Sequence, residues 1–195
     1  MYIRLALVST LSIIAFACNT KPSDADLKAQ DIIRFEPMEH LNSYYTIQKS
    51  LGLEDLRFSQ DSFQLRVWFS GWSDSADVFV VKQANNGAWS STRIRFPLKS
   101  DNVRMHYRKC TSENGQQIWE SLRQAGIKEF HGMDSITLGR YSDGEIAIFQ
   151  IATLSSYQTC ISQVGFGWHS ENDAPEVKEA TRYVTLLFSE MDCIK

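Results

Sequence analysis

The chain has 195 residues, and 20 Lys and Arg stand against 23 Asp and Glu, for a formal net charge of −3. Aromatic residues make up 12% of the chain, which excludes a disordered protein, and no basic stripe is present, which argues against a nucleic acid partner. The length corresponds to a single domain that can bury a core without a structural metal.

Residues 1–17 have the layout of a secretory signal. A short start carrying Arg4 precedes the apolar run "LALVSTLSIIAF", and the small residues Ala15 and Ala17 lie on either side of Phe16 just before Cys18. The run is too short for a spanning helix, which needs about 20 apolar residues. "AFAC" resembles the cleavage site of bacterial lipoprotein signals, in which the cysteine sulfur receives a diacylglycerol. We therefore expect 1–17 to be a lipoprotein signal peptide and Cys18 to be lipidated; the alternative is an ordinary signal peptide cut elsewhere.

Residues 18–35 read as a polar tether that could end in a short helix. Residues 36–195 are then expected to form a single globular α+β domain. The lipid would hold this domain in the bacterial cell envelope, preferentially at the outer membrane, facing the periplasm or the cell surface.

Alternating apolar residues predict the strands of the first half. "MEHLNSYYTIQKSLGL" is read as a short helix ending at Gly52, and strict alternation starts at Phe63. "ADVFVV" is the next strand, "NNG" supplies turn chemistry, and a return strand from Trp89 is closed by Pro97. "NVRMHYRK", at 102–109, alternates again and is read as a further strand.

A helix is expected in "TSENGQQIWESLRQAGI", where apolar residues recur at helical spacing. Gly126 follows that stripe in the position of a helix-ending glycine, and Ile127 can make the apolar contact that accompanies it. This stripe is read as ordinary core packing.

The second half repeats the pattern of strands followed by a helix. "SITLGRY" is read as a strand, "SDGE" as a turn, and "IAIFQIATL" with "SSYQTCISQVGF" as a hairpin. "NDAPEVKEATRYVTLLFSEM" is a helix in which Asp173 can cap, Pro175 occupies the first turn and Glu176 completes a capping box. Its apolar stripe consists of Val177, Ala180, Val184, Leu187 and Met191, widened by Tyr183 and Phe188.

Three residue pairs lie 68 positions apart in the two halves, namely Val78 with Ile146, Val80 with Ile148, and Trp89 with Tyr157. They suggest two βββα units; the alternative is that two unrelated hairpins look alike. Either way, we expect an α+β fold in which hairpins form a largely antiparallel sheet and two main helices pack on one face.

The stretch "MDSITLGRYSDGEIAIFQIATLSSYQT", followed by the terminal helix, resembles small bacterial lipoproteins of uncharacterised function. The resemblance extends over about 61–188 and concerns turn and strand motifs. It implies a secreted lipoprotein domain without an established activity, and it identifies no catalytic residues.

Three cysteines remain once Cys18 is assigned to lipid: Cys110, Cys160 and Cys193. An oxidising compartment favours one disulfide among them and one buried thiol, with the pairing undecided, and the alternative is that no disulfide forms. No CxxC or Cys/His cluster occurs, so we expect no metal and no cofactor.

Aromatic residues in loops are the candidate binding residues: Trp72, Phe166, Trp168 and His169. Such side chains can stack on sugar rings or anchor a partner protein, although they also cover core edges. No catalytic motif is present, and Cys160 with His169 or Cys110 with His131 would need a third group to act as a nucleophile pair.

These observations favour a non-catalytic, lipid-anchored envelope protein that contacts the membrane through lipid alone and binds a protein or a glycan. One alternative is a structural or assembly subunit of an envelope complex. A less favoured one is a hydrolase of envelope polymers.

Overall fold

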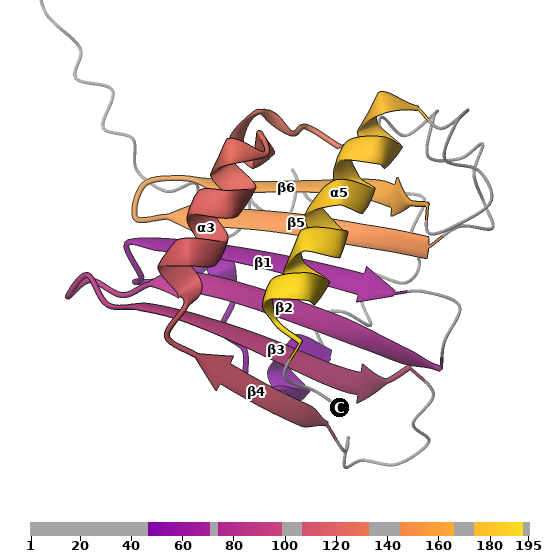
Figure 1. Cartoon of the computed structure of the whole chain (residues 1–195). Coiled ribbons are helices and arrows are strands. Elements are labelled where there is room, and N and C mark those ends of the chain that lie inside the picture. Colours follow the sequence, from indigo (N-terminus) through magenta and orange to yellow (C-terminus); the bar gives the residue numbers. More distant parts are fainter. Residues whose placement is uncertain (1–46, 71–73, 99–106, 133–144, 166–173, 193–195) are drawn as a thin grey trace, which may run out of the picture.

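The computed structural model describes residues 47–70, 74–98, 107–132, 145–165 and 174–192 (Figure 1). Residues 47–50 are helical, two short 3-10 turns follow at Leu56–Phe58 (η1) and Ile127–Glu129 (η2), and the two longer helices are α3 (Gly115–Gln124) and α5 (Pro175–Glu190). The strands are β1 (Phe63–Ser70), β2 (Ser75–Gln83), β3 (Trp89–Pro97), β4 (Arg108–Ser112), β5 (Glu145–Thr153) and β6 (Tyr157–Val164).

The strands form one six-stranded sheet in the order β4-β3-β2-β1-β5-β6. Every neighbouring pair is antiparallel. β1 lies inside the sheet between β2 and β5, while β4 and β6 are the two edges. The predicted α+β class with a largely antiparallel sheet is confirmed.

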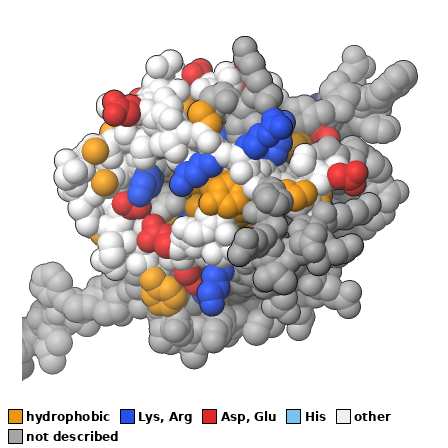
Figure 2. All heavy atoms as spheres, turned by 90° about the horizontal axis from the view of Figure 1, so that it is seen from below, with side chains coloured by type: hydrophobic (Ala, Val, Ile, Leu, Met, Phe, Trp, Pro, Cys, Tyr) orange, Lys and Arg blue, Asp and Glu red, His pale blue; other side chains and the backbone are white. Residues whose placement is uncertain are grey.

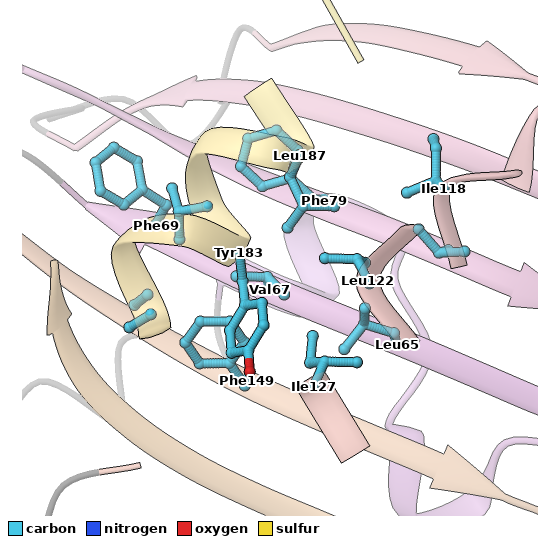
Figure 3. Close-up of a cluster of buried hydrophobic side chains, with 14 of the residues drawn as sticks. Leu65, Val67, Phe69, Phe79, Ile118, Leu122, Ile127, Phe149, Tyr183 and Leu187 are labelled. Atoms are coloured by element: carbon cyan, nitrogen blue, oxygen red, sulfur yellow. The ribbon is translucent and has the colours of Figure 1, made fainter. Parts of the chain in front are cut away.

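Both long helices lie on the same face of the sheet, as predicted (Figure 1). Alternate residues of β1 point to that face because successive strand side chains point in opposite directions. Leu65, Val67 and Phe69 there meet Leu122 of α3 and Leu187 of α5 in a shared core (Figure 3). All members of the apolar stripe predicted for the last helix are buried.

The opposite face of the sheet carries a second core. Val78 and Ile94 are fully buried there, together with Trp68, and Leu51 belongs to the same cluster. Ile47 and Leu53 pack against it, so the stretch that precedes β1 covers this face. The sheet therefore lies between two layers, one of which the sequence did not predict.

Two details of the elements differ from expectation. Of the strand expected at 102–109, residues 102–106 lie outside the described part of the chain, Tyr107 is in no strand and has 43% of its surface exposed, and β4 extends from Arg108 to Ser112. At the start of α5 the N-cap is Ala174, which makes no side-chain capping bond, and Pro175 occupies the first turn. Asp173 and the strand "SITLGRY" lie outside the described residues.

The glycine expected to end α3 has a left-handed backbone, with φ 94° at Gly126.

Among the described residues, the two halves correspond over one strand only. Val78, Val80, Ile146 and Ile148 all face the second core, as a repeat would require. Trp89 instead packs toward the helices. Tyr157 lies on the other face, where its hydroxyl accepts a hydrogen bond from Gln150 and Gln150 accepts one from Trp68. A register difference of one residue reverses the faces of a strand, so the repeat does not extend through the hairpin.

Candidate functional site

Most residues predicted to carry function lie outside the described part of the chain. These are Cys18, Trp72, Phe166, Trp168, His169 and Cys193. The lipidation site and the aromatic loops therefore remain predictions. The groups described below are those that the sheet, its helices and the preceding stretch bring together.

The cysteines on the sheet differ in chemical state. Cys110 of β4 is disulfide-bonded. Cys160 of β6 is not in a disulfide, and its Sγ lies 4.0 Å from the carbonyl oxygen of Phe130. A nucleophile made of Cys110 and His131 is excluded, because a disulfide sulfur cannot form the thiolate that such chemistry requires.

A small cavity of about 200 Å³ opens where Cys110 meets the end of α5. Its described lining consists of Ser91, Cys110, Ser112, Asn114, Ser189, Glu190, Met191 and Asp192, none of which is a histidine. The wall is made of hydroxyls, an amide and two carboxylate residues beside the disulfide. Such a lining offers hydrogen bonds but no nucleophile paired with a base.

β4 lies at the lower edge of the sheet in Figure 1. Arg108 and Lys109 are exposed on it. Figure 2, which views the molecule from below, shows Lys and Arg side chains bordering a hydrophobic area. Charged side chains on a short edge strand disfavour pairing with a further strand.

Arg66, at the centre of β1, is the most unexpected residue of the structure, because its side chain is completely buried. Its Nη1 donates to Gln48 Oε1 at 3.1 Å and its Nη2 to the Glu54 carbonyl at 3.0 Å. When the oxygen and nitrogen of the Gln64 amide are exchanged, both atoms find partners: the oxygen accepts from Arg66 and the nitrogen donates to the Glu54 carboxylate. Arg66 therefore ties the stretch before β1 to the second face of the sheet.

Burial also sets the ionisation of this group. It disfavours the charged form and lowers the pKa of Arg66 to about 10, although the Glu54 carboxylate opposes this effect. Nearby, the pKa of Asp55 lies below its usual value. Burial alone would raise this pKa, but the bonds from Arg57 outweigh burial. One of these bonds joins Arg57 Nε to Asp55 Oδ1 at 2.9 Å. Arg66 remains charged at neutral pH and acts as an anchor.

Arg93 of β3 is a further buried arginine, and it faces the helices. Its Nε donates to Asp77 Oδ1 at 2.8 Å, and its Nη1 donates to the Met191 carbonyl, just after α5, at 3.3 Å. Its guanidinium carbon lies 4.6 Å from the centre of the Phe188 ring. A cation at this position satisfies carbonyls that the end of a helix leaves without an intrahelical donor.

Sequence reasoning missed Arg66 and Arg93. Alternation placed Arg66 on the side of its strand that is normally solvated. The signal that this side is covered was Trp68 on the same side, together with the apolar Val78 and Val80 that pair with Trp68 and Arg66 on β2. Among the residues that the structure describes, no three His, Cys, Asp or Glu side chains gather in a way that could hold a metal ion.

The chain matches no protein-family model, and no curated protein matches its sequence. No helix within the described ranges is both long enough and apolar enough to cross a membrane. The functional proposal below therefore depends on the sequence and on the geometry of the described residues.

Proposed function

We propose that this protein is a lipid-anchored, non-catalytic protein of the bacterial cell envelope whose α+β domain binds a protein or a glycan. The observation that carries the proposal is the N-terminal segment, in which an apolar run and small residues lead to Cys18. The polar stretch 18–35 then separates this cysteine from the domain expected at 36–195.

The state of Cys110 supports this compartment. Disulfides form and persist in the periplasm and at cell surfaces and are rare in the cytosol, where thiols are kept reduced. A disulfide at Cys110 is therefore consistent with an exported domain. The candidate binding surface is the set of aromatic loops that carry Trp72 and Trp168.

The anchor is tested by membrane fractionation of Cys18→Ala, with Cys160→Ala as a matched control that also removes one thiol. We expect Cys18→Ala to leave the membrane fraction and Cys160→Ala to stay in it. The intact mass of the native protein should equal residues 18–195 plus acyl chains. Membrane retention of Cys18→Ala, together with an unmodified mass, would refute the anchor.

The binding surface is tested separately by photo-crosslinking in intact cells. A crosslinker replaces Trp72 or Trp168 in turn, and a control replaces Leu154, which is 55% exposed between β5 and β6. We expect discrete products, either a protein band or a glycan adduct, from the two tryptophan positions only. Products from Leu154 alone would place recognition at the β5–β6 hairpin and would overturn the aromatic-loop assignment.

A further inference from the structure

We propose that the disulfide partner of Cys110 is Cys193, so that a covalent bond ties edge strand β4 to the chain immediately after α5. The chain contains four cysteines, at 18, 110, 160 and 193. Cys110 is disulfide-bonded, whereas Cys160 is not in a disulfide. The partner of Cys110 within the chain is therefore Cys18 or Cys193.

The position of Cys160 agrees with its exclusion. It belongs to β6, and β4 and β6 are the opposite edges of the sheet. Five spacings of about 4.8 Å separate two such edges, or roughly 24 Å. Disulfides join Cα atoms that are at most about 7 Å apart.

Cys193 is favoured by where the end of α5 lies. Cys110 lines one small cavity together with Ser189, Glu190, Met191 and Asp192. Asp192 immediately precedes Cys193 in the chain, and consecutive Cα atoms are only 3.8 Å apart. The described chain therefore ends one residue before Cys193, at a residue that lines the same cavity as Cys110.

Two side chains hold this end of α5 in place independently of any cysteine. The Asn114 amide donates to the Glu190 carbonyl at 3.3 Å, while its oxygen lies 2.6 Å from the Ser91 hydroxyl. Arg93 donates to the Met191 carbonyl. The segment that leads to Cys193 is thus held on β3 and on the start of α3 by non-covalent bonds.

The bond completes what we call the C-terminal clasp, which consists of Arg93, Asn114 and the Cys110–Cys193 disulfide. In its formation, the two thiols each lose a proton and their sulfurs join. The two electrons pass by thiol–disulfide exchange to the disulfide of an envelope oxidoreductase, which is reduced to a dithiol. The inference does not depend on the lipid anchor, although it leaves Cys18 available for one.

Peptide mapping of the full-length exported protein tests the pairing directly. Thiols are blocked with N-ethylmaleimide under denaturing, non-reducing conditions, and the chain is cut with trypsin, which places the four cysteines on four different peptides. We expect residues 110–123 linked to residues 183–195, and a blocked thiol on the peptide that contains Cys160.

Other results overturn the inference in distinguishable ways. A link between Cys110 and the peptide that begins at Cys18 would refute both this pairing and the lipid anchor. A blocked thiol at Cys110 on a protein that still carries lipid would refute the pairing alone. A disulfide between two copies of the chain, seen as a dimer without reductant, would refute it as well.

Stability provides a second readout. Cys110→Ser, Cys193→Ser and the double variant should unfold at the same temperature, roughly 10 °C or more below wild type, because each removes the same bond closing a long loop. Cys160→Ser serves as the matched control and should retain the disulfide-linked peptides. A double variant that is much less stable than either single variant would contradict a shared bond.

Discussion

Two arginines share one carboxylate on the helix-facing side of the sheet, and their different burial allows a sharp test. Arg93 Nε lies 2.8 Å from Asp77 Oδ1, and only 3% of the Arg93 side chain is exposed. Arg95 Nε lies 3.2 Å from the same oxygen, but 37% of the Arg95 side chain is exposed. We expect Arg93→Ala to destabilise the domain far more than Arg95→Ala.

The magnitudes follow from burial. Breaking a buried ion pair costs about 3–5 kcal/mol, and in Arg93→Ala the buried Asp77 carboxylate keeps only the partly exposed Arg95 as its partner. Arg93→Ala also removes the donor to the Met191 carbonyl and the cation from above the Phe188 ring. An exposed pair contributes about 0–1 kcal/mol, so Arg95→Ala should cost no more than that. In a chain of this size each kcal/mol lowers Tm by about 2–4 °C, which corresponds to a loss of roughly 6–20 °C for Arg93→Ala.

The assay is thermal and urea unfolding followed by circular dichroism, on protein released from the membrane by Cys18→Ala. Arg93→Lys serves as a further control, because it keeps the charge but cannot form the two-pronged contact of a guanidinium. We expect it to fall between wild type and Arg93→Ala. Equal losses for Arg93→Ala and Arg95→Ala would show that burial does not determine the contribution of this pair.

Three further perturbations test other parts of the structure. Leu187→Asp places a charge at a fully buried position and should leave the domain unfolded at 25 °C by circular dichroism; a cooperative native-like melt would contradict the core assignment. Gly132→Ala and Gly52→Ala both place an alanine in a left-handed backbone, at φ +70° and +67°, which costs about 1–2 kcal/mol. Only at 132 would the added Cβ lie 2.5 Å from a backbone oxygen. Urea unfolding should therefore show a larger loss for Gly132→Ala, and equal losses would disprove the close contact. Arg66→Met removes the anchor of the stretch before β1, so the Leu53 amide should exchange with deuterium faster while amides of α5 do not change; uniform exchange would argue against this anchor.

The elements with one apolar and one polar face were predictable from the sequence. β1 and α5 each show their period clearly, because each buries one side against the same core. Among the described residues of "NVRMHYRK", Arg108 and Lys109 belong to β4, which continues to Ser112, beyond the predicted end. The true position is set by pairing with β3, where Ser91 faces Ser112 and Arg95 faces Arg108, and sequence periodicity contains no information on that register.

Burial of the polar face was missed for a different physical reason. Alternation separates the two faces of a strand, but it does not reveal whether another segment covers the polar one. Gln64 and Arg66 read as solvated residues, yet they are 3% and 0% exposed. Only the position of the stretch before β1, a tertiary feature, converts them from surface residues into a buried network with Gln48 and Glu54.

Arg66 and Arg93 perform equivalent tasks at opposite ends of the described domain. Arg93 holds the chain where α5 ends, and Arg66 holds the chain where the described domain begins. Neither segment is paired into the sheet, so both depend on side-chain bonds and apolar contacts for their position.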